Sequence, residues 1–249
     1  MDIVIGLVIG FAIGATGVGG GTLTAPALVL LMGYSPRLAV GTALVFATVV
    51  KIFASAEYLF RKQIHFKVLG YLLLGGIPGA LIGALALEKL NVARANQWIL
   101  FGIGAVVMVS AITSVVKFRS SRPPDSPKSK LLPLLALPIG LETGFSSSGA
   151  GALGTVLLFH FTTLPPAMVV GTDLAFGLAV SAIGGSVHAL SGTCNWVALY
   201  RLIPAGIVGS LLGVRACTVL PKQALRKSIL ICAAMIGLTL VVKGIKGIL

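Results

Sequence analysis

Charged side chains are scarce in this sequence. Asp, Glu, Lys and Arg make up 10% of the 249 residues, whereas a soluble domain averages about 25%. Hydrophobic residues reach 57%, the mean hydropathy is +1.05, and long apolar stretches recur along the chain. This composition excludes an ordinary soluble domain. It predicts an all-α, multi-pass protein of the cell (cytoplasmic) membrane, with the lipid bilayer as its surroundings.

Residues that bind metals or act as nucleophiles are also few. None of the three cysteines belongs to a C-x-x-C pair, which disfavours a thiol–disulfide carrier. His, Cys and acidic residues are too sparse for a metal site, and no nucleophile, base and orienting group line up. We therefore predict no metal, no cofactor and no enzymatic activity. The net charge of +13 does not predict a nucleic-acid partner, because the basic residues stand mostly between apolar segments.

The hydropathy pattern divides the chain into apolar segments. We predict eight of them: 3–32, 38–60, 68–87, 95–116, 132–160, 167–190, 196–215 and 228–246. The stretch "KFRSSRPPDSPKSK" (117–130) is polar, basic and rich in proline, which predicts a loop outside the bilayer. The predicted organisation is an N-terminal transmembrane repeat (1–120), a loop (121–130) and a C-terminal transmembrane repeat (131–249).

The two halves resemble each other when the chain is shifted by 130 residues. Between residues 10–46 and 140–176, 12 of 37 positions are identical without a gap, and five of the twelve are shared glycines. "VGTALVF" (40–46) also meets "VGTDLAF" (170–176). Shared glycine placement over this length indicates an internal duplication, a common construction of membrane transporters.

The first segment of each half is too long for one simple crossing. Thirty helical residues would extend about 45 Å, whereas the hydrocarbon core is about 30 Å thick. The glycine-rich stretch "GVGGG" (17–21) divides the first of these segments, so it is either a broken spanning helix or a re-entrant hairpin. The re-entrant arrangement places 12 basic residues on one side against 5 on the other, and therefore fits the positive-inside tendency better. It leaves three crossings per half, which makes the repeats inverted.

The two breaks predict an anion-binding surface. Non-helical backbone at membrane depth persists only where protein or water covers it. A half-helix that begins there directs free N–H groups and the positive end of its dipole into the site. The predicted substrate-binding residues are Thr16, Gly17, Gly19, Gly20, Gly21 and Thr22 in the first half, and Ser146, Ser147, Ser148, Gly149 and Gly151 in the second. The alternative for such glycines is close helix packing, which we predict for the spaced rows Gly6, Gly10, Gly14 and Gly75, Gly79, Gly83.

A second repeated motif is "GTAL" (41–44) and "GTDL" (171–174). Thr42 and Thr172 either face the binding surface or bond to a carbonyl of their own helix. We place both among the candidate substrate-binding residues.

Four ionisable residues inside apolar segments are candidate functional groups, because such residues are costly in a membrane. Lys51 is a candidate for anion binding. Asp173 and Glu142 would repel an anion unless protonated, and burial favours the neutral form, so we predict proton coupling for both. His188 is a third candidate for proton transfer, with a helix cap as the alternative. A buried ion pair of Lys51 with Asp173 or Glu142 would also explain these residues.

The stretch "GVGGGTLTAPALVLLMGYSPRLAVGTALVF" (17–46), followed by "GGIPGALIG" (75–83), resembles the TauE/SafE family of bacterial sulfite and organosulfonate exporters. The resemblance covers the whole chain and implies efflux of small sulfur-containing anions such as sulfite or sulfoacetate. It singles out Gly19, Gly20, Gly21, Thr22, Pro26, Gly41 and Thr42, and in the second half Gly149, Gly151, Gly171 and Thr172. Val156 stands where Pro26 has its counterpart, and Asp173 stands opposite Ala43, so another oxyanion or a carboxylate, and import, stay open.

The expected function is therefore secondary transport of a small anion by alternating access between two inverted repeats. A passive anion channel and a non-transporting membrane assembly are the alternatives. The sequence does not specify an oligomeric state.

Overall fold

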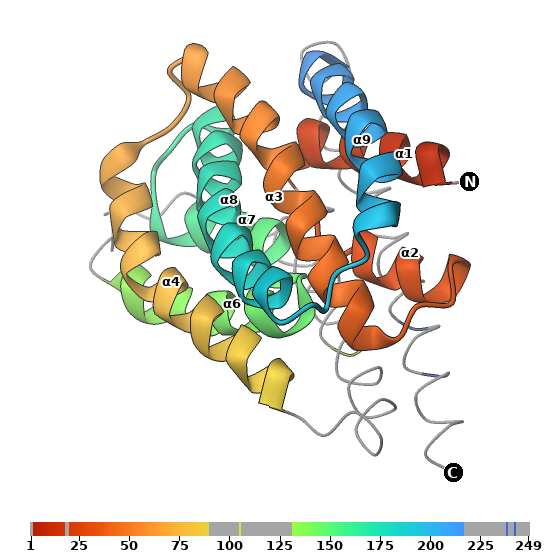
Figure 1. Ribbon diagram of the computed structural model, residues 1–249. Coiled ribbons are helices and arrows are strands. Elements are labelled where there is room, and N and C mark those ends of the chain that lie inside the picture. Colours follow the sequence, from red (N-terminus) through yellow and green to blue (C-terminus); the bar gives the residue numbers. More distant parts are fainter. Residues whose placement is uncertain are drawn as a thin grey trace.

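The structure is a computed structural model that describes residues 2–17, 20–89 and 131–216 and the single residues 105, 238 and 242. Within these ranges the chain forms helices and short connections, and no strand. The helices in chain order are α1 (Asp2–Thr16), α2 (Thr24–Leu31), α3 (Pro36–Phe60), α4 (Phe66–Lys89), α6 (Leu132–Ser146), α7 (Gly149–Phe161), α8 (Pro166–Leu190) and α9 (Trp196–Ala216) (Figure 1).

The helices of the first half recur in the second half at an offset of 130 residues. α1 matches α6 and α3 matches α8 at both ends, while α4 and α9 begin at matching residues. Pro36 and Pro166 occupy the first turn of α3 and α8, where the missing N–H removes no helical hydrogen bond. The duplicated sequence thus forms duplicated helices.

The first segment of each half is broken, as the sequence predicts. Segment 3–32 divides into α1 and α2, and segment 132–160 divides into α6 and α7. At 15 residues, α1 and α6 each measure about 22 Å, which is less than the hydrocarbon core. Whether these segments are re-entrant stays a prediction. The predicted segments 95–116 and 228–246 and the loop 121–130 fall outside the described ranges, apart from residues 105, 238 and 242.

The two halves exchange their first helices. α1 lies along α9 and α6 lies along α4, while α3 and α8 pack together between these two pairs (Figure 1). Glycines permit the close approach, because a Cβ built at Gly10 would overlap the backbone of Gly206, and one at Gly140 the backbone of Gly76. The predicted packing role of the two glycine rows is confirmed: Gly6, Gly10 and Gly14 contact Leu202, Gly206 and Ser210, and Gly75, Gly79 and Gly83 contact Pro133, Leu137 and Leu141.

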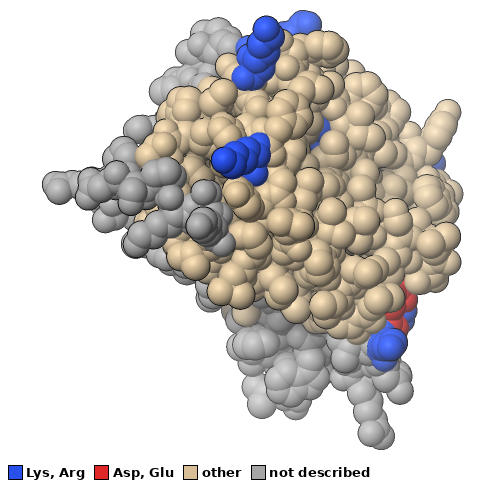
Figure 2. Space-filling model, turned by 90° about the vertical axis from the view of Figure 1, so that its left-hand side faces the viewer, with Lys and Arg blue, Asp and Glu red and all other residues tan. Residues whose placement is uncertain are grey.

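The outer surface is apolar and the interior holds charge. Helices α3, α4, α8 and α9 are long and apolar enough to cross a membrane. Large hydrophobic side chains such as Leu74, Val197 and Leu134 are exposed, and Lys, Arg, Asp and Glu occupy little of the face in Figure 2. Lys51 and Asp173, in contrast, are buried. This distribution suits a multi-pass membrane protein.

Candidate functional site

The two helix breaks meet inside the molecule. We call Gly17–Leu23 the first break and Ser147–Gly151 the second break. Gly17 and Ser147 occupy equivalent positions, and both adopt positive φ, +72° and 67°. A Cβ built at Gly21 would overlap the carbonyl of Ser147, so the two backbones are in contact. The break residues of the two halves, 126 residues apart in sequence, therefore form one surface.

Lys51 and Asp173 lie beside this surface. Lys51 on α3 is 2% exposed and Asp173 on α8 is 0% exposed. A Cβ built at Gly20 would lie 3.4 Å from Lys51 Nζ, and one at Gly177 would lie 2.5 Å from it. The ammonium group thus lies between the first break and α8, where it attracts the Asp173 carboxylate electrostatically. A buried cation beside exposed backbone N–H groups is chemically suited to an anion.

Two hydroxyl groups at the breaks are available to a ligand. Thr22 and Ser147 are 1% and 3% exposed, and their oxygens have no hydrogen-bond partner in the described part of the chain. Ser147 Oγ lies next to Gly21, because a Cβ built there would be 2.6 Å from it. A buried hydroxyl without a partner is costly, so a ligand or water that bonds to both groups would stabilise this arrangement.

The other predicted serines of the second break bond to α6 instead. Ser148 Oγ donates to Glu142 Oε1 at 3.0 Å and lies 2.8 Å from Ser146 Oγ. Ser146 Oγ lies 3.1 Å from the Glu142 carbonyl. Thr143 Oγ1 accepts the Ala150 N–H at 2.8 Å and so satisfies a backbone donor inside the break. These contacts fix the shape of the second break, and they place Glu142 in that network.

The remaining predicted break residues divide into three cases. Thr16 Oγ1 donates to the Ala12 carbonyl of its own helix at 2.8 Å. Gly149 begins α7, and Gly151 has φ 109°, so the regular helix starts after it. Gly19 lies outside the described residues.

Thr42 and Thr172 join the two halves and make contacts away from the breaks. Thr42 Oγ1 accepts the backbone N–H of Asn195, and Thr172 Oγ1 accepts that of His65, both at 3.0 Å. Thr42 also donates to the Leu38 carbonyl, which is the own-helix alternative. The two contacts are equivalent at an offset of 130 residues, so each motif threonine holds the start of the other half's helix, α9 or α4.

Next to each threonine, a motif glycine permits the same approach. A Cβ built at Gly41 would overlap the Thr193 carbonyl, and one at Gly171 would overlap the Gln63 carbonyl. The "GT" pair is thus a repeated contact between halves, which explains its spacing without a ligand.

His188 belongs to a separate polar group. Its Nδ1 lies 2.8 Å from Glu88 Oε1 and 3.0 Å from Thr193 Oγ1, and Arg37 forms an ion pair with Glu88. This group connects α3 and α4 with the end of α8. His188 stands 15 residues beyond Asp173, about 22 Å along α8, so the two do not share a site.

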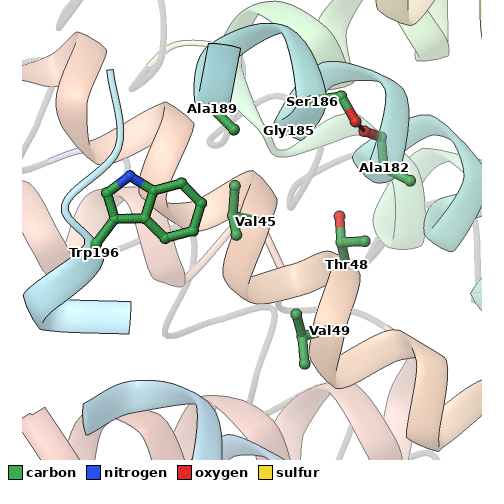
Figure 3. Close-up of a pocket in the computed structure, with 8 residues that line it drawn as sticks. All are labelled: Val45, Thr48, Val49, Ala182, Gly185, Ser186, Ala189 and Trp196. Atoms are coloured by element: carbon green, nitrogen blue, oxygen red, sulfur yellow. Dashed lines mark hydrogen bonds between the residues drawn. The ribbon is translucent and has the colours of Figure 1, made fainter. Parts of the chain in front are cut away.

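A surface pocket of about 180 Å³ lies between α3 and α8 beside Trp196 (Figure 3). Its hydroxyl groups, on Thr48 and Ser186, donate to carbonyls of their own helices at 2.7 Å. Its other lining residues are apolar or glycine: Val45, Val49, Ala182, Gly185, Ala189 and Trp196. The pocket has no group suited to an anion and is distinct from the breaks.

Sequence reasoning missed Thr155, Thr143 and the Arg37–Glu88 pair. Thr155 Oγ1 lies 2.6 Å from Asp173 Oδ2. A hydroxyl one residue after a glycine carries no pattern that identifies it. Among the described residues, no group of three or more His, Cys, Asp or Glu side chains could hold a metal ion.

An apolar exterior, four long apolar helices and a buried charged centre at paired helix breaks are features of multi-pass membrane transporters. The family model "Sulfite exporter TauE/SafE" matches residues 3–240, and the chain belongs to this family.

Curated relatives carry matching descriptions. The chain is 32% identical to "Probable membrane transporter protein YjnA" of Bacillus subtilis (strain 168) over 222 residues, which cover 85% of this chain and 87% of the relative. It is 24% identical to "Probable membrane transporter protein YunE" of the same organism, covering 98% and 97%. A "Probable membrane transporter protein" of Haemophilus influenzae is 26% identical, covering 87% and 84%. No solved structure gives a significant match.

Proposed function

We propose that the protein is a secondary transporter that exports a small sulfur-containing anion, such as sulfite or sulfoacetate, across the cytoplasmic membrane. The family description supports the substrate class. The observation that carries the proposal is the position of Lys51, whose ammonium group lies beside the first break, which contacts the second. There the anion binds Lys51, the hydroxyls of Thr22 and Ser147, and the free N–H groups of the breaks.

Alternating access follows from the repeated halves. In this proposal they are inverted repeats, and one rocks against the other around the anion. The first break comes from one half and the second break from the other, so relative motion of the halves alters the site directly. The carboxylates Asp173 and Glu142, and His188 outside the site, are the candidates for coupling transport to protons.

Counterflow in proteoliposomes tests the proposal. Purified protein is reconstituted in vesicles loaded with unlabelled sulfite, and uptake of ³⁵S-sulfite is followed. We expect saturable uptake that internal sulfite accelerates and that external sulfoacetate inhibits, whereas acetate and phosphate do not. Linear uptake without trans-stimulation would indicate a passive channel, and strong inhibition by acetate would indicate a carboxylate carrier.

The variant Lys51→Gln tests the site itself. A charge-assisted hydrogen bond contributes about 1.5–3 kcal/mol, so the half-saturating sulfite concentration should rise about ten- to a hundredfold. Lys67→Gln is the matched control, because Lys67 lies on the exposed surface of α4. Equal half-saturation in both variants would remove Lys51 from the proposed site.

A further inference from the structure

Thr155 lies between two acceptor oxygens. Its Oγ1 is 2.6 Å from the Gly151 carbonyl oxygen and 2.6 Å from Asp173 Oδ2. Both distances are those of O–H···O hydrogen bonds. A threonine hydroxyl carries one hydrogen and donates only once, and neither a carbonyl nor an ionised carboxylate supplies another. The second contact therefore requires a proton on the carboxyl group.

We propose that Asp173 is the coupling proton site, and that one proton travels with each anion. The proton resides on Asp173 Oδ2 and is donated to Thr155 Oγ1, whose own hydrogen is donated to the Gly151 carbonyl. The proton enters from water on one side of the membrane and leaves to water on the other. This inference rests on the proposed function, and it names the coupling residue and its positioning residue, Thr155.

The relay ends in the second break itself. Gly151 has φ 109° and precedes the regular part of α7, so its carbonyl belongs to the non-helical backbone. Thr155 sits one turn further along α7 and is 0% exposed. Protonation of Asp173 therefore stabilises the broken conformation that forms the anion site.

The charges around Asp173 explain why anion and proton bind together. Lys51 on α3 acts electrostatically on the carboxyl. Gly17 beyond α1 and Gly154 on α7 approach its two oxygens and carry no charge. When an anion binds Lys51, it neutralises the charge that favours ionised Asp173, so the proton is retained. When the anion leaves, Lys51 and the carboxylate attract each other and the proton is released.

The other two candidates are engaged elsewhere. Glu142 accepts from Ser148, and His188 contacts Glu88 at the far end of α8. The first half has no equivalent relay, because Ala43 and Ala25 stand at the positions of Asp173 and Thr155. The two halves are therefore chemically unequal, with one such relay per chain.

The test compares two measurements on the same proteoliposomes with labelled sulfoacetate. This probe keeps its charge between about pH 6.5 and 8, so it carries no proton of its own. One measurement is exchange at equal pH, and the other is net accumulation driven by a pH gradient, with the acid side outside. The ratio of accumulation to exchange isolates coupling from binding.

For wild type we expect accumulation driven by the pH gradient and by no sodium gradient. In Thr155→Val and Asp173→Asn the ratio should fall at least tenfold. Thr155→Ser keeps the hydroxyl and should retain the ratio within about twofold, as should the control Thr163→Val on the exposed α7–α8 connection.

Several results would overturn the inference. A Thr155→Val ratio equal to wild type would remove the relay, and accumulation driven by sodium at equal pH would replace the proton. If Thr155→Val does not fold, an interior pH dye in wild-type vesicles decides, because accumulation without interior acidification contradicts proton co-transport. Absence of exchange in wild type at equal pH would instead refute the proposed function.

Discussion

The contact between Gly21 and Ser147 provides the sharpest test of the crossed breaks. In Gly21→Ala, the added Cβ would overlap the Ser147 carbonyl, which is backbone and cannot rotate away. Forcing an extra carbon into a packed interior costs about 1–3 kcal/mol. The two breaks must separate to accommodate it, and the anion site between them must widen. We expect lower thermal stability in detergent and at least tenfold weaker half-saturation by sulfite.

The matched control is Gly70→Ala on α4. A Cβ at Gly70 meets no atom within 4 Å, and alanine favours a helix by up to about 1 kcal/mol, so stability should be equal or higher. Ser147→Gly should not rescue Gly21→Ala, because the atom that the methyl group overlaps is the Ser147 carbonyl. Wild-type stability together with wild-type half-saturation in Gly21→Ala would refute the contact between the breaks.

Three further predictions concern contacts away from the breaks. Thr172→Val leaves the His65 N–H without its acceptor, so thermal unfolding should show a loss of about 1–3 kcal/mol, whereas Thr172→Ser should keep most of the stability; equal loss in both would reject the hydrogen bond. Glu88→Gln weakens the ion pair that joins the halves and should lower the melting temperature, while Glu57→Gln on the exposed α3 pair should not, since such pairs contribute about 0.2–1 kcal/mol. Burial raises the pKa of the Cys194 thiol to about 11, so in a variant with the other cysteines replaced by serine, maleimide labelling at pH 7 should be slow until detergent denaturation; rapid labelling of folded protein would contradict this burial.

The sequence alone predicted the duplication, the helix breaks and the glycine packing rows. These features follow from local composition, since small residues at matched positions permit close approach and adjacent glycines interrupt a helix. The segment ends were also close: the prediction 167–190 compares with Pro166–Leu190 for α8. Burial of Lys51 and Asp173 was expected because both lie inside apolar segments.

Only the tertiary structure decided what these residues contact. Thr42 and Thr172 were interpreted as possible ligands, but their partners are backbone N–H groups 153 and 107 residues away in sequence. The exchange of first helices between halves likewise has no local signal, because both faces of α1 are apolar.

The same distinction applies to the charged groups. The sequence offered Asp173, Glu142 and His188 equally as proton sites, and the structure gives each a different set of neighbours. Asp173 faces Thr155 and the second break, Glu142 bonds to Ser148, and His188 joins Glu88. Residue type and depth follow from the chain, but the rotation of each helix about its axis depends on packing against helices distant in sequence, and that rotation selects the partner of every buried side chain.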